Sequence, residues 1–217
     1  MINFSEDELI LLPNQGHCNL NYLLEKGEKK YHVRKFRLAD RNRKFEFKIQ
    51  KLASKKKIAA KAFYLDATIM IGEFIEGVHK SKLSYKEIRK LANSIKKLHK
   101  IKLRQKPIIF SKEVIRKTKK FKHELVLCHG DLNVKNILFE KTAKLIDWEY
   151  AGINDKYFDL ATVCKEFKFN KIEEAYFLRA YGDKINFKKL GVYKEIYEIL
   201  HKEWFEKLDK GKLEFLT

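Results

Sequence analysis

Two kinds of hydrophobic pattern divide the chain near residue 77. Before that point, short stretches rich in aromatic and β-branched residues, typical of strands, lie between polar turns. They predict strands at 19–25, 30–36, 61–66 and 68–75, with the first two joined as a hairpin across the glycine-bearing turn at 26–29. Apolar residues at helical spacing predict one helix at 41–53. The first 77 residues therefore predict a small antiparallel sheet with one helix.

After residue 77 the pattern becomes mainly helical. Ser84 and Glu87 form a capping-box pattern at the start of a helix with apolar residues at helical spacing. Further helices are predicted at 111–122, 157–167, 171–181 and 188–208, the third of these with Asn170 as its N-cap. Three apolar runs, at 125–128, 136–139 and 144–146, are too short for helices and predict strands around a loop.

The polar residues beside those short strands carry the chemistry. Asp131 is followed five residues later by Asn136, and Asp147 comes sixteen residues after Asp131. Phosphoryl transfer needs one carboxylate to orient and deprotonate the attacking hydroxyl. It also needs an amide oxygen and a second carboxylate to hold Mg²⁺ against the ATP phosphates. The spacing therefore indicates a kinase that uses ATP and Mg²⁺.

The same residues carry a family resemblance. Residues 129–139 resemble the HxDxxxxN catalytic loop of the choline/ethanolamine kinase and aminoglycoside phosphotransferase superfamily. Residues 145–161 contain Ile-Asp-Trp-Glu-Tyr-Ala-Gly, then Asn-Asp, then Phe-Asp-Leu-Ala, and are most similar to bacterial choline kinases. The resemblance implies an α+β, bilobal, protein-kinase-like fold. Its N-lobe would cover 1–77, with a hinge near 73–77, and its C-lobe would cover 78–217.

The resemblance also implies roles for individual residues. Asp131 would be the catalytic base, and Asn136 and Asp147 would be the Mg²⁺ ligands. The strand at 30–36 is similar to the one that carries a basic residue to the ATP phosphates. Arg34 is favoured there over Lys35, and strand alternation allows only one of the two to face the cleft.

Further residues are implied around ATP. Glu46 would pair with the basic residue of the strand. The turn at 14–19 resembles the turn that covers the phosphates, with Gly16 and Asn19 as contacts, although a glutamine and a cysteine stand where a second glycine and a threonine are common. Residues 71–77 resemble the hinge, whose backbone at Glu73 and Ile75 would bind adenine.

Choline is the favoured substrate, and its quaternary ammonium is held by aromatic faces and a nearby carboxylate. Tyr197, His201 and Trp204 are spaced to share one helix face, and His201 stands where choline kinases usually have a tryptophan. The candidate substrate contacts are Asp131, Glu149, Tyr150, Glu166, Phe169, Tyr197, His201 and Trp204. Ethanolamine, thiamine and aminoglycosides are alternative substrates. A catalytically silent, basic binding module on a kinase fold is the alternative of another class.

The overall charge tests that last alternative. The chain has 217 residues, 48 of them basic and 29 acidic, and a net charge of +19. Only eight of the basic residues are arginines, and the lysines are spread over the whole length, so nucleic acid is not the favoured partner. Three widely spaced cysteines favour a reducing cytoplasm. No apolar run is long enough for a membrane span, and residues 1–12 do not resemble a secretory signal.

Overall fold

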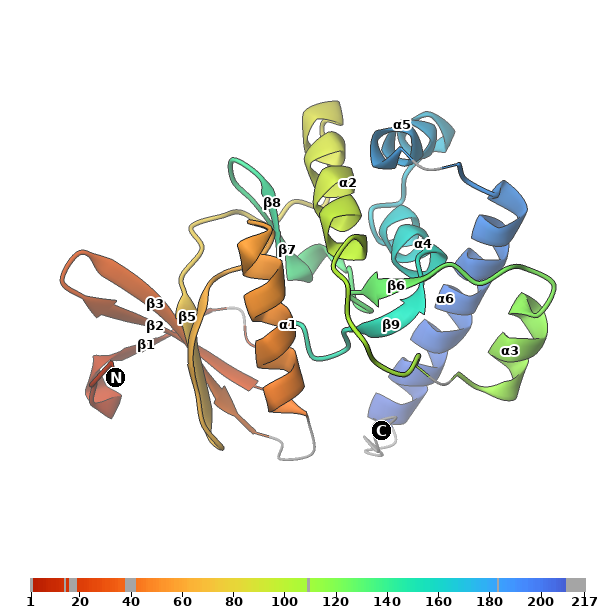
Figure 1. The fold of residues 1–217 in the computed structure, drawn as a ribbon. Coiled ribbons are helices and arrows are strands. Elements are labelled where there is room, and N and C mark those ends of the chain that lie inside the picture. The colour runs from red at the N-terminus through yellow and green to blue at the C-terminus, as the bar shows by residue number, and fades with distance from the viewer. Residues whose placement is uncertain are drawn as a thin grey trace.

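The computed structural model describes residues 2–13, 15, 19–37, 42–108, 110–182 and 184–209, without the side chains at 204, 205 and 207–209. The structure has two parts (Figure 1): an N-terminal sheet with one helix beside it, and a mainly helical C-terminal part. The predicted α+β fold class is confirmed. Along the described residues, no helix is long and apolar enough to cross a membrane.

The N-terminal sheet is antiparallel, with strand order β1-β2-β3-β5-β4. Its elements are a 3₁₀ turn η1 (Glu6–Glu8), β1 (Leu9–Leu11), β2 (Asn19–Lys26), β3 (Lys29–Phe36), α1 (Arg43–Lys55), β4 (Ala62–Leu65) and β5 (Ile69–Glu73). The hairpin of β2 and β3 closes at Gly27, whose φ of 59° favours glycine. The sequence did not predict η1 or β1, because three residues are too few to show a period.

The two faces of this sheet have different environments. Leu24, Val33 and Ile71 form a buried cluster on one face, against which Ile2 and Phe4 pack. The opposite face carries the side chains of β3 that alternate with Val33 and is covered in part by α1. That second face looks toward the C-terminal part, because a β3 side chain contacts a residue there.

The C-terminal part contains the remaining elements: α2 (Tyr85–His99), α3 (Lys112–Thr118), β6 (Leu125–Cys128), η2 (Val134–Asn136), β7 (Ile137–Phe139), β8 (Ala143–Leu145), β9 (Gly152–Asp155), α4 (Tyr157–Glu166), α5 (Lys171–Tyr181) and α6 (Phe187–Asp209). The predicted helices and short strands are present, although α3 is shorter than expected. The sequence missed β9, which pairs antiparallel with β6.

The core of the C-terminal part fixes the elements that carry the polar residues. In α2 the isoleucine, leucine and alanine positions are fully buried, and the expected capping box is formed between Ser84 and Glu87. Helix α4 is buried from Tyr157 to Cys164, so it runs through the middle of this part (Figure 1). A helix packed on all sides is a rigid support for the loops that touch it.

Candidate active site

The loop between β6 and β7 holds Asp131 in place through two asparagines. Asn133 Nδ2 donates to Asp131 Oδ1 at 3.0 Å, and Asn136 Nδ2 donates to Oδ2 at 2.7 Å. Asn136 Nδ2 also reaches the Asp131 carbonyl at 3.0 Å. Burial raises the pKa of Asp131 above its ordinary value; the Asp147 charge adds to this, while His129 and both asparagines oppose it. The carboxylate is therefore oriented from both sides.

Gly130 is required by the shape of this loop. Its φ is 83°, and an added Cβ would lie 2.4 Å from the carbonyl oxygen of Tyr150. No side chain fits in that space without moving the backbone of one of the two segments. The close approach therefore joins the loop of Asp131 to the segment that follows Asp147.

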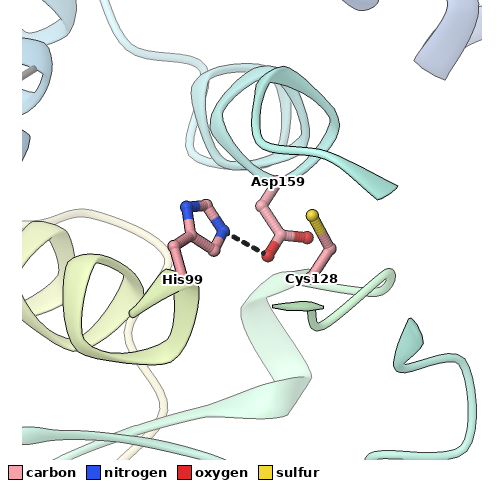
Figure 2. Close-up of side chains that lie close together, drawn as sticks. All are labelled: His99, Cys128 and Asp159. Carbon is pink, nitrogen blue, oxygen red and sulfur yellow. Dashed lines mark hydrogen bonds and ion pairs between the residues drawn. The ribbon is translucent and has the colours of Figure 1, made fainter. Parts of the chain in front are cut away.

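Asp159 of α4 anchors the loop between β6 and β7 through its carboxylate. Asp159 Oδ2 accepts the backbone N–H of His129 at 2.9 Å, and Oδ1 accepts that of Gly130 at 3.1 Å. His99 of α2 donates from Nε2 to Asp159 at 3.0 Å (Figure 2). The Tyr181 hydroxyl lies 2.8 Å from His99 Nδ1. Asp159 stands in the Phe-Asp-Leu-Ala motif, for which the sequence predicted no role. No pattern in the sequence identified His99.

His99, Asp159 and Cys128 could in principle hold a metal ion, since one donor atom of each lies within 4.8 Å of the others (Figure 2). Both ring nitrogens of His99 and both oxygens of Asp159 already have partners. Burial raises the pKa of the Cys128 thiol well above its ordinary value, so the thiol stays protonated. The cluster is a hydrogen-bond network that supports the loop.

Asp147 lies just after β8 and is tied to the same loop. His129 Nε2 donates to the carbonyl of Ile146 at 3.0 Å, directly before Asp147. Asp147 has a φ of 64°, a left-handed conformation that is uncommon for a residue other than glycine and that clusters at functional sites. The two predicted metal ligands, Asn136 and Asp147, are thus carried by segments that are bonded to each other.

Arg34 connects the two parts of the molecule. Its Nη1 donates to Glu46 of α1 at 2.6 Å and to Asp147 at 3.1 Å, and its side chain is almost fully buried. Burial alone would lower the pKa of Arg34, but the neighbouring carboxylates raise it. Lys35 points to the opposite face, where it pairs with Glu6 and lies over the ring of Tyr22.

Arg43 is a second buried arginine beside this bridge. It donates to Glu46 at 2.9 Å and to the side chain of Asn19 at 2.9 Å, and it lies 3.5 Å from Glu149. Asn19 and Glu149, predicted to contact ATP and substrate, are therefore held by Arg43. Its spacing, three residues before Glu46, is the signal in the sequence that could identify this arginine.

The predicted adenine contacts are placed only in part. The backbone N–H of Glu73 donates to the Lys61 carbonyl at 2.8 Å, which uses that donor within the sheet. Ile75 follows as a half-buried residue. Gly16 lies outside the described residues. Gln15, its described neighbour, accepts the Asn21 N–H at 2.7 Å, so Gln15 is bonded to β2.

The substrate candidates separate into two groups. Tyr197 of α6 donates to Glu166 of α4, and the charge of Asp131 helps to raise the pKa of Tyr197, after burial and Glu166. His201 is exposed, with its ring 5.4 Å from that of Tyr197. Phe169 instead packs between two core phenylalanines. Tyr150 is half-buried, and the Trp204 side chain lies outside the described residues.

Comparisons with known proteins show which proteins this chain is similar to. Residues 105–191 match the model of the choline/ethanolamine kinase family. Protein LicA of Haemophilus influenzae is 36% identical over 76 residues, which cover 35% of this chain and 27% of that protein. The sequence match therefore spans just over a quarter of that relative's length.

Solved structures share the fold over nearly the whole chain. The choline kinase LicA from Streptococcus pneumoniae superposes with a TM-score of 0.77 at 23% identity, over 95% of this chain and 87% of that one. A structure of LicA in complex with AMP gives a TM-score of 0.70 at 22% identity, over 96% and 88%. The chain is therefore similar to the choline/ethanolamine kinases over residues 105–191, and it shares the fold of solved choline kinases over nearly its whole length.

Proposed function

We propose that the protein transfers the γ-phosphoryl group of ATP to a primary hydroxyl of a small cationic alcohol, with choline as the favoured substrate. One observation carries the proposal. Asn136 donates to Asp131 at 2.7 Å, the charge of Asp147 acts on Asp131, and Arg34 reaches Asp147 from the other part of the molecule at 3.1 Å. A base, two metal ligands and a phosphate clamp are the parts that phosphoryl transfer needs.

Asp131 acts as the base. Asn133 and Asn136 hold its two oxygens, so the carboxylate is oriented before the substrate arrives. One of these oxygens accepts the proton of the substrate hydroxyl as the oxygen–phosphorus bond forms. Since positioning and electrostatics provide most of the catalysis in phosphoryl transfer, this preorganisation matters as much as basicity.

Asn136 and Asp147 fit a Mg²⁺ ion. Both contacts of Asn136 to Asp131 use its amide nitrogen, which leaves the amide oxygen as a ligand, and Asp147 supplies a carboxylate. Oxygen ligands of this kind are those that Mg²⁺ prefers. When bound, the ion offsets the negative charge of the ATP phosphates.

Arg34 binds phosphate oxygens. Glu46 and Asp147 fix its guanidinium, and its buried Nε has no hydrogen-bond partner among the described residues. A buried donor without a partner is costly, and an anionic oxygen in the cleft removes that cost. Glu46 positions Arg34 and does not itself reach ATP.

Choline is favoured by the aromatic and acidic groups near Asp131. Tyr197 lies close enough to Asp131 for that charge to help raise the pKa of Tyr197, and the Tyr197 hydroxyl donates to Glu166. An aromatic ring and a carboxylate are what a quaternary ammonium needs, because it offers no hydrogen-bond donor. Ethanolamine, thiamine and aminoglycosides stay alternatives for the same machinery. The buried free thiols Cys128 and Cys164 fit the proposed reducing cytoplasm.

The proposal is tested by ADP release from Mg-ATP with choline, ethanolamine, thiamine or kanamycin, using Asp131→Asn as the control. We expect turnover with choline that falls by ~10²–10⁴-fold in the variant, the range a general base contributes. Turnover with another alcohol alone would correct the substrate and keep the mechanism. No turnover, together with salt-dependent binding of mixed RNA or DNA, would favour the silent binding module.

A further inference from the structure

A small cavity lies at the opposite end of β6 from the catalytic loop. Strand β6 begins with Leu125, which lines the cavity, and ends with Cys128, three residues before Asp131. The cavity has a volume of about 310 Å³, and its walls come from the last turn of α2, the start of β6, the N-cap of α4 and the last residue of α5. The described residues that line it include none with a role in the proposed reaction.

Positive charge is in excess around this cavity. Lys96, Lys100 and Lys156 line it, against one acidic residue, Glu124. The Glu124 carboxylate is already shared by two ammonium groups, since it lies 2.6 Å from Lys156 and 3.3 Å from Lys189. Neither Lys96 nor Lys100 forms an ion pair with a residue that the structure describes. Their like charges, one helical turn apart, repel each other, and an anion between them removes that repulsion.

Two of the three lysines are fixed before any ligand arrives. Lys96 is half-buried, and its Nζ would lie 2.8 Å from a Cβ added at Gly182, so it rests against the backbone that ends α5. Lys156 is buried and paired with Glu124. Side chains that are already ordered lose less freedom when they bind a ligand. The volume lies at the small end of the range for ligand sites, about 300–1,000 Å³, which favours a compact anion over a nucleotide.

We propose that this cavity is an anion site that binds a small ligand carrying a phosphate group, either inorganic phosphate or a small phosphate monoester. Lys96 and Lys100 donate charge-assisted hydrogen bonds to the phosphate oxygens, and Lys156 adds positive charge from the start of α4. The site is separate from the residues proposed to hold ATP. Binding there does not require the proposed function to be correct.

The cavity shares a wall with the support of the catalytic loop. His99 and Tyr181 line the cavity and lie 2.8 Å apart, from Nδ1 to the hydroxyl oxygen. From its other nitrogen, His99 donates to Asp159, which accepts the N–H groups of His129 and Gly130. A ligand that ties α2, α4 and α5 together restrains this chain of hydrogen bonds. Occupancy of the cavity therefore reaches the loop of the catalytic base.

Amide NMR spectra of the whole chain, recorded during titration with sodium phosphate or glycerol phosphate at constant ionic strength and without nucleotide, test the site. We expect saturable shifts of the Leu125, Val126 and Gly182 amide signals, accompanied by shifts at His129 and Gly130. The double variant Lys96→Gln/Lys100→Gln should weaken this binding about 10-fold or more, because each lost charge-assisted hydrogen bond contributes at least that factor.

The matched control is Lys97→Gln/Lys102→Gln, which removes the same charge from exposed positions that do not line the cavity. We expect it to keep the wild-type affinity. Tighter binding of glycerol phosphate than of phosphate assigns the site to a monoester, and equal or weaker binding assigns it to free phosphate.

Three results would overturn the inference. The first is the lack of saturable shifts at Leu125, Val126 and Gly182, including the case in which phosphate shifts only the signals around Arg34. The second is an equal loss of binding in both double variants, which would mean that diffuse charge attracts the anion. The third, binding without shifts at His129 and Gly130, would overturn the link to the loop. ADP release by Lys96→Gln/Lys100→Gln in phosphate-free buffer tests the proposed function separately and should equal that of the wild type.

Discussion

Substituting Gly130 by alanine tests how closely the loop of Asp131 must fit its surroundings. The new Cβ would lie 2.4 Å from the carbonyl oxygen of Tyr150, whereas such contacts are normally longer than 3.0 Å. The loop and the Tyr150 segment must therefore separate by roughly 1 Å to reach the 3.4 Å at which ordinary van der Waals contact begins. A displacement of that size can cost ~10²-fold in rate when it moves a catalytic group. The φ of 83° adds ~1–2 kcal/mol of backbone strain for a residue with a side chain.

We therefore expect Gly130→Ala to lower kcat by ~10²-fold and the free energy of unfolding by a few kcal/mol. The assay is steady-state ADP release, normalised to the folded fraction from circular dichroism, together with urea denaturation. Gly191→Ala is the matched control, because an added Cβ there meets nothing within 4 Å. In helix α6 this control should gain ~0.5–1 kcal/mol of stability and keep its kcat. A Gly130→Ala protein with wild-type kcat and stability would refute the reasoning.

Three further predictions concern groups that support the site or the fold. Glu46→Gln removes the charge between two buried arginines and should lower the free energy of unfolding, measured by urea denaturation, by ~3–5 kcal/mol. The control Glu195→Gln, in an exposed ion pair, should lower it by under ~1 kcal/mol, and equal costs would contradict the role of burial. Asp159→Asn places an amide against the N–H groups of His129 and Gly130, and it should lower kcat far more than it raises the KM for ATP or for the alcohol. A change in KM alone would contradict the anchoring role. Glu87, whose pKa is lowered from 4.5 to about 2, first by Lys80 and then by the cap, stabilises the fold above pH 4.5 and loses that contribution as pH falls toward 2. Glu87→Gln should therefore cost ~1 kcal/mol at pH 7 and nearly nothing at pH 2, and a pH-independent difference would count against this account.

Much of the fold followed from local patterns. The β2–β3 hairpin, α2 with its capping box, β6 and α5 lie where alternation, helical spacing and cap residues predict them. The missed strands β1 and β9 are short, and β9 depends on its partner β6, which comes earlier in the chain. Pairing across such a separation leaves no local trace in the sequence.

The site residues likewise divide into those that a local sequence pattern predicts and those that depend on partners far away in the chain. The HxDxxxxN spacing indicated Asp131 and Asn136, and the Ile-Asp after the next short strand indicated Asp147, because the chemistry requires those residue types together. His99 gave no signal, since its partner Asp159 is sixty residues away along the chain. Phe169, predicted as a substrate contact, is half-buried and packs against Phe177 of the core. An aromatic residue near a motif can serve either purpose, and only tertiary packing decides between them.

The central claim is that Asp131 directs a phosphoryl group from ATP to an alcohol. Phosphorus NMR of Mg-ATP and choline with the protein measures this directly, because it distinguishes a phosphomonoester of choline from inorganic phosphate. The account predicts that the monoester grows in step with ADP for the wild type and slows by ~10²–10⁴-fold for Asp131→Asn. Monoester formation by Asp131→Asn at the wild-type rate would contradict it.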